Sequence, residues 1–554
     1  MVYWFFGFLL IAVLIVIAGI IKKRVTSKAK LAEIKASWGS PKEEKRSFTL
    51  IARYLQDTGG DYSASAGDLD LDDVFSYIDR TNSRPGQQFL YKKLHSPEIS
   101  EPFFSKLEKR IALFSGDEQL REQTEAKLSS VSDHEAYYLS GLFSHNQQSL
   151  FSPLTLFYIR FAAPAVILLI YGLFLYPNPV FAMLLLACII ANVIIHYSNK
   201  SKMVRYTHTL PQLHKLISTG EWLFNNKLLD EDNGIQQDLE KLSKLKKSLG
   251  FVNVQNTIAA DPTSLSYLFS EWLKILLMLE PFNFVVSLNQ VNKYPKEIRR
   301  IFESVGEVDM AISIQSVRMS LPHYCLPEFL QQSQKIVITD LYHPLIENCV
   351  LNSIRLDSSQ GALITGSNMS GKTTFIRAIA INALLSQTIH TSFAREYKAP
   401  LLRIFTSINM TDDLGADTSY YQAEALSIRN IIRNSAASKP INSLVIIDEI
   451  FRGTNTIERI AAAKAVLSYF IGNNNFAIVS THDLELAQLL GNEYKVFSFE
   501  ERAGGDQLLF DYKLKEGLLK NKNGIIVLKS LDYPQNIIDE AARISLQLRD
   551  KYDL

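Results

Sequence analysis

Nine consecutive residues have the composition of a phosphate-binding loop. Glycines let a backbone curl so that its N–H groups point at an anion, and a helix that follows adds the positive end of its dipole. Lys372 is spaced to reach the β- and γ-phosphates of a nucleoside triphosphate, and Thr373 to ligate Mg²⁺. The residues predicted to bind the nucleotide are Gly366, Ser367, Asn368, Met369, Ser370, Gly371, Lys372, Thr373 and Thr374.

Two adjacent acids follow an apolar segment further along the chain. Residues 444–447 read Leu-Val-Ile-Ile, which is typical of a strand buried on both faces, and Asp448 and Glu449 come directly after them. A nucleotide hydrolase needs one carboxylate to hold Mg²⁺ and another to activate the attacking water. We expect Asp448 to hold the metal through water and Glu449 to act as the general base.

A histidine follows a second apolar segment, residues 476–479, after Ser480 and Thr481. The carboxyl ends of parallel strands face the ligand crevice of an open α/β sheet. His482 is therefore predicted to sense the γ-phosphate. The strand that positions the loop is expected at residues 362–364, and a helix is expected to begin near Phe375.

The motifs together resemble the MutS family of mismatch-repair ATPases. In that family the loop reads Gly-Pro-Asn-Met-Gly/Ser-Gly-Lys-Ser/Thr, and Arg-Gly-Thr-Ser-Thr follows the acidic pair. Here residues 368–373, 448–456 and 480–482 carry the likeness. The resemblance implies an ATPase that uses ATP and Mg²⁺. Ser419 lies in a segment with the family's spacing, so it is expected to act in trans at the partner's nucleotide, within a homodimer.

The resemblance covers most of residues 70–545. Residues 77–97 resemble the opening of the family's core domain, residues 308–346 its passage into the ATPase, and residues 510–534 its closing strands and helix. It implies a multi-domain fold in which a mostly α-helical MutS-core-like domain precedes a C-terminal α/β P-loop ATPase domain of the ABC-like type.

Several positions depart from the family pattern. Ser367 replaces a Pro, Asn455 replaces a Ser, and Ile457-Glu458-Arg459 stands where Tyr-Asp-Gly is common. None of these changes removes a phosphate, magnesium or water contact, so they bear on coupling to a partner. The core-like segment begins near residue 70, which leaves no room for the family's mismatch-reading and connector domains.

The N-terminal segment 3–21 is apolar and uncharged, and Lys22, Lys23 and Arg24 follow it at once. At about 1.5 Å per residue it can cross a hydrocarbon layer of about 30 Å. Because the positive charge follows the apolar segment, we predict an uncleaved anchor with its carboxyl side in the cytoplasm.

Two further apolar segments, residues 161–176 and 180–195, flank a Pro-Asn-Pro turn and predict a transmembrane hairpin. The basic residues outside it predict that both outer ends are cytoplasmic. In soluble relatives this region extends into lever and DNA-clamp helices, so the hairpin is expected to stand in place of the clamp. A further apolar segment, 272–286, is interpreted as a core helix because Lys274 and Glu280 would be costly at mid-bilayer.

Charge and cysteine content limit the function classes. The formal net charge is +1, which gives no support for a dedicated duplex binder, although it leaves room for a local basic patch. The three cysteines show no metal-binding spacing and indicate no disulfide framework, which fits a reducing cytosol.

These observations predict a multi-pass protein of the cell (inner) membrane with its core and ATPase domains in the cytoplasm. The expected regions are an anchor at 1–22, a tether at 23–68, core-like helices at 69–157 and 198–325, a hairpin at 158–197 and the ATPase at 326–554. Two functions remain open. One is an ATPase that acts on DNA in mismatch repair or recombination; the other is a membrane-bound, ATP-driven switch that binds no DNA.

Overall fold

The computed structural model describes most of the chain, and every structural statement below concerns those residues. Three predictions fall outside them: the apolar segment 3–21, Asn368 and Ser419. The described residues are 29, 31–43, 45–60, 63, 65–97, 100–145, 151–229, 234–258, 265–330, 334–367, 369–408, 420–437, 441–473, 475–504, 507–518 and 533–552.

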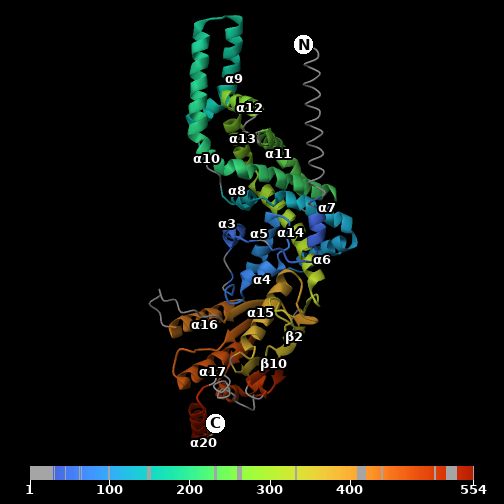
Figure 1. The fold of residues 1–554 in the computed structure, drawn as a ribbon, viewed down its shortest axis with the longest axis vertical. Coiled ribbons are helices and arrows are strands. Elements are labelled where there is room, and N and C mark those ends of the chain that lie inside the picture. The colour runs from blue at the N-terminus through green and yellow to red at the C-terminus, as the bar shows by residue number, and fades with distance from the viewer. Residues whose placement is uncertain are drawn as a thin grey trace. The chain divides into compact units, whose positions relative to one another are not determined.

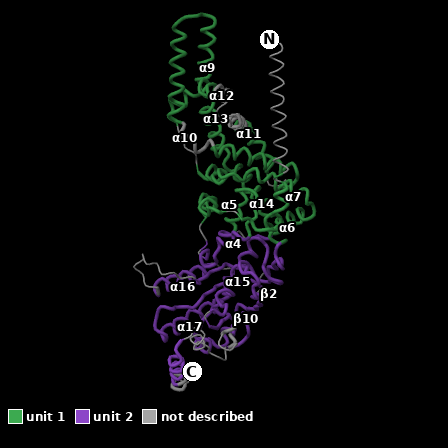
Figure 2. The backbone as a smooth tube through the Cα atoms, in the orientation of Figure 1, with its two compact units in different colours: residues 1–61, 78–93, 102–319 green, residues 62–77, 94–101, 320–554 purple. Residues whose placement is uncertain are grey.

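The chain divides into two compact units (Figure 2). Unit 1 comprises residues 1–61, 78–93 and 102–319, and unit 2 comprises residues 62–77, 94–101 and 320–554. Each unit therefore contains segments that are distant in sequence, and the change from helices to strands near residue 320 separates them (Figure 1).

Unit 1 is helical throughout its described residues. Its elements are α2 (Phe48–Ile51), α3 (Arg53–Asp57), α5 (Arg84–His95, which runs into unit 2), α6 (Glu101–Gly116), α7 (Glu118–Leu128), η1 (Ser129–Val131), η2 (His134–Tyr138), α8 (Leu139–Ser144), α9 (Pro153–Leu175), α10 (Pro179–Asn225), α11 (Ile235–Ile258), α12 (Leu265–Leu276), α13 (Leu279–Lys293) and α14 (Pro295–Ser320).

A buried carboxylate ties the start of α5 to the middle of α14. Asp309 is fully buried and accepts hydrogen bonds from the backbone N–H groups of Asn82 (2.9 Å) and Ser83 (2.7 Å). Gly86 packs so closely that a Cβ would lie 2.2 Å from Asp309 Oδ2. Burial raises the pKa of Asp309 to about 6. The residues that resemble the family's core domain are thus joined here by hydrogen bonds and close packing.

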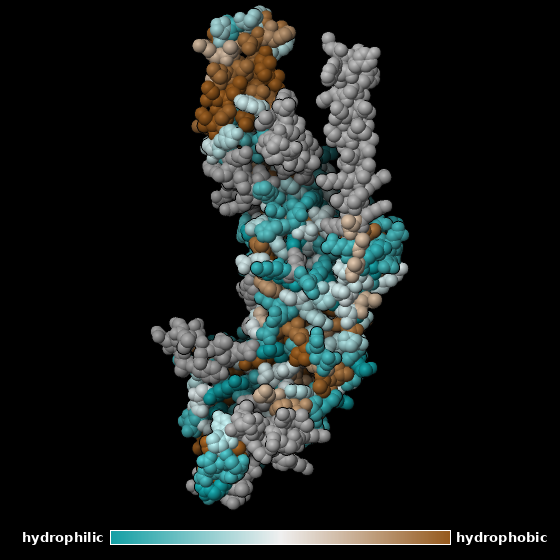
Figure 3. Space-filling model, in the orientation of Figure 1, coloured by the Kyte–Doolittle hydropathy of each residue, from teal (hydrophilic) through white to brown (hydrophobic). Residues whose placement is uncertain are grey.

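Helices α9 and α10 form a long hairpin. Proline in the first turn and a side-chain cap start each helix: Ser152 accepts from Thr155 N (3.3 Å) and Asn178 from Val180 N (2.9 Å). Residues Pro153–Leu175 and Pro179–Asn199 are each long and apolar enough to cross a membrane, with 17% and 11% of their most apolar windows buried. The predicted segments 161–176 and 180–195 lie within these helices, except for Tyr176, which is the C-cap of α9. The apolar atoms form a broad brown surface on the hairpin (Figure 3).

Unit 2 is built on a six-stranded sheet of order β10-β9-β4-β8-β7-β6. All neighbouring strands are parallel except β10, which is antiparallel to β9. The strands are β4 (Gly361–Gly366), β6 (Leu402–Ser407), β7 (Asn442–Asp448), β8 (Phe476–Thr481), β9 (Tyr494–Gly504) and β10 (Gln507–Glu516).

Helices cover both faces of this sheet. On one face, Val445, Ile447 and Val479 pack with Leu467 of α17 and Ile428 of α16 in a buried apolar cluster. Helix α15 contacts the sheet and also β2, and it is buried over most of its length. Because successive side chains of a strand point to opposite faces of the sheet, alternate residues of these strands pack against different helix layers. The remaining elements are α4 (Leu71–Ile78), α15 (Lys372–Thr388), α16 (Tyr420–Ala437), α17 (Thr456–Gly472), α18 (Leu484–Leu490), η4 (Gly491–Glu493) and α20 (Gln535–Tyr552).

A smaller sheet of order β1-β5-β2-β3 completes unit 2. Strand β1 runs parallel to β5, and the other pairs are antiparallel. The strands are β1 (Glu328–Phe329), β2 (Lys335–Leu341), β3 (Asn352–Asp357) and β5 (Glu396–Ala399).

Candidate nucleotide-binding site

The sheet register brings the predicted motifs to one edge. Strand β4 pairs with β8, and β8 pairs with β7, all in parallel. Asp448 at the end of β7 is in register with Ser480 of β8, and Thr365 of β4 with Thr481. The phosphate loop, the acidic pair and His482 therefore follow three neighbouring strand ends, as the sequence predicts for a ligand crevice.

Two glycines give the phosphate loop its shape. Gly366 has φ +153° and Gly371 has φ +100°, and Gly371 caps the N-terminus of α15. A Cβ on Gly366 would lie 2.8 Å from Ser370 Oγ and 3.0 Å from the carbonyl oxygen of Phe499. Met369, with φ +74°, is 83% exposed at the tip of the loop. A side chain at Gly366 would thus distort the loop that brings the start of α15 to the cleft.

Lys372 is folded back onto its own loop. Its Nζ donates to the carbonyl oxygens of Gly366 and Ser367, both at 2.7 Å, and the residue is 5% exposed. These carbonyls compensate the buried positive charge. The same ammonium group is within the loop that phosphates would enter, so it can exchange carbonyl partners for phosphate oxygens.

The predicted magnesium ligands already contact each other. Thr373 Oγ1 donates to Asp448 Oδ2 at 2.7 Å, and Ser480 Oγ donates to Asp448 Oδ1. Hydroxyl and carboxylate oxygens suit Mg²⁺, which keeps several waters and phosphate oxygens in its shell. Within the described residues no group of three or more His, Cys, Asp or Glu side chains could hold a metal. Two protein oxygens, those of Thr373 and Asp448, leave most of the Mg²⁺ shell to waters and phosphate oxygens, so this donor set fits a metal bound jointly with a nucleotide.

Glu449 lies beside a guanidinium and an imidazole. Arg452 Nε is 2.8 Å and His482 Nδ1 is 3.4 Å from Glu449 Oε2. The hydrogen bond with His482 holds the pKa of Glu449 below its ordinary value, with further contributions from Arg452 and Lys372 that outweigh burial. The same hydrogen bond raises the pKa of His482. Glu449 is thus kept ionised, the state that a general base requires.

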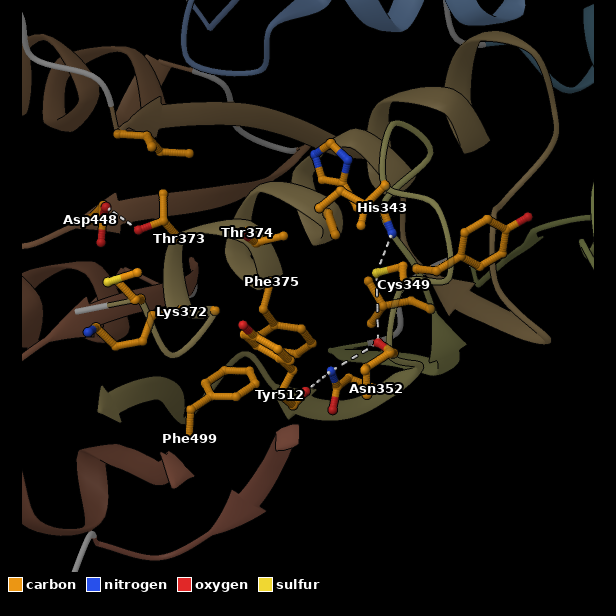
Figure 4. Close-up of a pocket in the computed structure, with 18 of the residues that line it drawn as sticks. His343, Cys349, Asn352, Lys372, Thr373, Thr374, Phe375, Asp448, Phe499 and Tyr512 are labelled. Atoms are coloured by element: carbon orange, nitrogen blue, oxygen red, sulfur yellow. Dashed lines mark hydrogen bonds between the residues drawn. The ribbon is translucent and has the colours of Figure 1, made fainter. Parts of the chain in front are cut away.

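The cleft beside the loop has a volume of about 890 Å³ and continues past the phosphate-binding end. Figure 4 shows Lys372, Thr373 and Asp448 together at one end and His343 and Asn352 at the other. Tyr512, in a bulge of β10 with φ +51°, also lines the cleft.

Asn352 of β3 fixes the bulge that carries Tyr512. Its Nδ2 donates to the Tyr512 carbonyl (2.9 Å), and its Oδ1 accepts from Leu514 N (2.8 Å). A tyrosine ring held beside a phosphate loop suits a planar nucleobase.

Burial lowers the pKa of His343, another lining residue, to about 4, so its imidazole is neutral near pH 7. The cleft thus offers a phosphate end and an aromatic end.

Residues 362–549 match MutS domain V. The DNA mismatch repair protein MutS of Ruminiclostridium cellulolyticum is 30% identical over 289 residues, and that of Acetivibrio thermocellus is 33% identical over 277 residues. Residues 362–549 are thus similar to a domain of the MutS family. The matches cover 50% and 47% of this chain but 32% and 31% of those proteins, so the chain spans about a third of the length of the curated relatives it matches.

A eukaryotic relative also matches. The DNA mismatch repair protein MSH3 of Saccharomyces cerevisiae is 29% identical over 295 residues, which is 50% of this chain and 28% of that protein. The predicted resemblance to MutS proteins is therefore confirmed.

Two departures from the MutS pattern have structural roles here. Asn455 caps α17 by accepting from Ile457 N at 2.9 Å. Arg459 of α17 binds Asp483 through two hydrogen bonds of 3.0 and 2.8 Å, next to His482. Both residues lie outside the phosphate loop. They stabilise the helix that follows the acidic pair and connect it to the segment that carries His482.

Sequence reasoning missed the roles of Ser480, Arg452 and Tyr512 at this site. Ser480 could have been found because it stands in register with Asp448, but the positions of Arg452 and Tyr512 depend on turns with positive φ. Sequence reasoning also gave no role in this site to Glu424, five residues after Ser419. The structure shows Glu424 buried against the turn after Asp448 of its own subunit, where it accepts from Phe451 N.

Proposed function

We propose that unit 2 binds ATP with Mg²⁺ and hydrolyses it. The observation that carries this proposal is the Thr373–Asp448 hydrogen bond of 2.7 Å, formed beside the phosphate loop and within the same cleft as Glu449. Magnesium, when bound, neutralises charge on the phosphates as the terminal phosphoryl group is transferred to water.

Each side chain has one task in this proposal. Lys372 exchanges its carbonyl partners for β- and γ-phosphate oxygens, and Thr373 and Asp448 hold the metal, Asp448 through water. Glu449 accepts a proton from the attacking water, and His482 orients Glu449 and the γ-phosphate. The loop N–H groups at the start of α15 bind the remaining phosphate charge.

The working form is proposed to be a homodimer. The MutS resemblance assigns Ser419 to the partner's nucleotide, and the helix after it, α16, begins at Tyr420. In this arrangement ATP binding draws two units 2 together, because each nucleotide is contacted from both subunits.

The protein is proposed to reside in the cell (inner) membrane, with the ATPase in the cytoplasm. Support comes from the α9–α10 hairpin, whose two helices are long and apolar enough to span a bilayer and are mostly exposed. Leu154 and Phe174, near opposite ends of α9, are 83% and 85% exposed. Exposed apolar surface of this extent is costly in water.

Two roles for the ATPase are considered. Action on DNA, in mismatch repair or recombination-related processing, is the first, because the relatives are named as DNA mismatch repair proteins. A membrane-bound switch that does not bind DNA is the alternative. The α9–α10 hairpin favours it, since unit 1 carries a candidate membrane element within its core helices.

Hydrolysis is tested with the full chain in nanodiscs. Glu449→Gln is expected to keep ATP affinity and to lose turnover, because only the base is removed. Lys372→Ala is expected to weaken ATP binding, and Asp448→Asn to raise the Mg²⁺ concentration needed. Asn430→Ala, on the exposed side of α16, serves as the control and should behave as wild type. Wild-type turnover by Glu449→Gln would refute the proposal.

DNA binding is tested with homoduplex, mismatched and branched DNA over a range of salt concentrations. Contacts with phosphates release counterions, so a DNA-binding protein must show an affinity that falls steeply with salt. Such a slope supports the first role. An ATPase without measurable binding at low salt supports the switch.

A further inference from the structure

Helices α12 and α13 present apolar side chains on their outer surface. Trp272 is 63%, Leu273 39% and Phe282 41% exposed, although all three are large and apolar. A core helix would direct such residues inwards and its charges outwards. These helices do bury Ile275 and Phe284, but the prediction of an ordinary core helix at 272–286 does not account for the three large apolar side chains on the outer surface.

Two charged residues of this pair, Lys274 and Glu280, have partners within the protein. Lys274 is 8% exposed, and its Nζ lies 2.7 Å from Glu271 Oε1. Glu280 Oε2 lies 3.7 Å from Nε2 of His196, which is fully buried in α10. The cost that charges would impose at a membrane is therefore reduced by partners within the protein.

A buried asparagine fixes the end of α12 against the hairpin. Asn192 of α10 is fully buried, donates from Nδ2 to the Leu276 carbonyl (2.8 Å) and accepts from the Tyr158 hydroxyl of α9 (2.7 Å). It satisfies one of the carbonyl groups that every helix leaves open at its C-terminus. Because Asn192 lies within the candidate span Pro179–Asn199, the end of α12 is level with that span.

The position of Asn192 and Leu276 along the hairpin corresponds to one boundary of its apolar part. From Arg160, an exposed charge on α9, to the Pro177 turn is about 26 Å at about 1.5 Å per residue, close to a hydrocarbon thickness of about 30 Å. Tyr158, and with it Asn192 and Leu276, lies at the Arg160 end. Trp272 is about one turn before Leu276 on α12, and Phe282 is in the first turn of α13, which follows directly, so both are near the depth where aromatic side chains concentrate in membrane proteins.

We propose that the α12–α13 pair is an interfacial membrane element whose outer surface, Trp272, Leu273 and Phe282, contacts phospholipid at the boundary between headgroups and acyl chains. The inference rests on the proposed insertion of the α9–α10 hairpin. It adds a second lipid-binding surface in the cytoplasmic leaflet and assigns Asn192 the task of joining that surface to the span.

The test is fluorescence quenching of the full chain in vesicles of phosphatidylcholine brominated either near the headgroup or near the chain end. The chain has four tryptophans, so the Trp272 signal is the difference between wild type and Trp272→Phe. Shallow bromine is expected to quench this signal more than deep bromine. Phe282→Trp in the Trp272→Phe background should give the same order.

Two reference variants in the Trp272→Phe background distinguish failure of the interfacial element from failure of hairpin insertion. Leu168→Trp, 68% exposed in the middle of α9, should be quenched most by deep bromine. Asn289→Trp, exposed on α13 about two turns beyond Phe282, should not be quenched. If Leu168→Trp is quenched and the Trp272 signal is not, the interfacial element is refuted and the hairpin stands.

Two further outcomes also overturn the inference. If no hairpin probe is quenched, membrane insertion itself fails, and the interfacial element with it. If the Trp272 signal is insensitive to bromine but shifts with the number of protein copies per vesicle, a second copy covers the surface instead of lipid.

Discussion

Glu424, in the second turn of α16, accepts a hydrogen bond from the backbone N–H of Phe451, two residues after Glu449. The Tyr421 and Phe451 rings are 5.9 Å apart, and a Cβ on Gly453 would lie 3.0 Å from Tyr421 Cβ. Glu449 and Phe451 both have positive φ, +55° and +63°, which is uncommon for such residues. The turn that presents the proposed base is therefore held in an unfavourable backbone conformation by α16.

Glu424→Ala is expected to reduce kcat and to leave ATP affinity unchanged. Without its acceptor the turn can relax, and a displacement of about 1 Å at the reacting group can cost roughly 100-fold in rate. Glu424→Gln keeps an acceptor oxygen and should recover most of the loss. Asn430→Ala on the exposed side of α16 is the matched control. Steady-state ATPase assays and nucleotide-binding titrations give kcat and affinity separately.

Equal losses of affinity and kcat in Glu424→Ala, together with a lower unfolding temperature, would indicate a general structural role. Failure of Glu424→Gln to recover activity would show that the charge of the carboxylate matters and not its hydrogen bond.

The His482–Glu449 pair gives a pH dependence of stability. The raised pKa of His482 means that its contribution is complete below its ordinary value of 6.5 and is lost as pH rises through the raised value. The lowered pKa of Glu449 means that its contribution is present above 4.5 and is lost as pH falls through the lowered value. The pair is therefore strongest between these two ordinary values.

His482→Gln should lower the unfolding temperature most near pH 5.5, and the difference from wild type should shrink towards about pH 9. The effect should be small, because His482 is 55% exposed and solvent screens the pair. Thermal unfolding of both proteins across this pH range measures it. A difference that does not change with pH would contradict the assigned pairing.

Membrane topology is predicted from the basic residues that flank the apolar segments. The Pro177-Asn178-Pro179 turn and the N-terminus are expected outside the cell, because Arg160 and the basic residues that follow the second apolar segment, Lys200, Lys202 and Arg205, should be cytoplasmic. In a chain without its native cysteines, Asn178→Cys should react with an impermeant maleimide in intact cells, whereas Lys28→Cys should react after permeabilisation. The reverse labelling pattern would invert this topology.

The chemistry of the site could be predicted from sequence because it depends on short motifs at strand ends. Residues 362–364, 444–447 and 476–479 are apolar segments of the right length, and parallel pairing places their carboxyl ends together. The turn after Asp448 could not be predicted in the same way. Its positive φ angles at Glu449 and Phe451 are imposed by Glu424, which is 27 residues from Phe451 in the sequence.

The end of the hairpin's second helix also differs from the end predicted from the sequence. Apolar composition indicated an end near residue 197, but α10 continues without a break to Asn225 through Pro211. The amino-acid composition shows where the apolar segment ends and does not show where the helix ends. The helix continues because its later residues, including Leu213 and Leu216, are buried in unit 1. A core helix was predicted at 272–286 because Lys274 and Glu280 would be costly at mid-bilayer, and the sequence could not show that Glu280 lies beside His196 of α10.

The shared site remains a prediction that mixed dimers can test. Ser419→Ala should lower turnover although its own phosphate loop is intact, and Lys372→Ala should lower it by weakening nucleotide binding. In a mixed dimer the intact loop of the Ser419→Ala subunit meets the intact Ser419 of the Lys372→Ala subunit, which restores one working site. Turnover of the mixture should therefore exceed that of either variant alone. Light scattering should show dimers in all three samples, so that absence of recovery, with dimers present, would mean that Ser419 does not act at the partner's nucleotide.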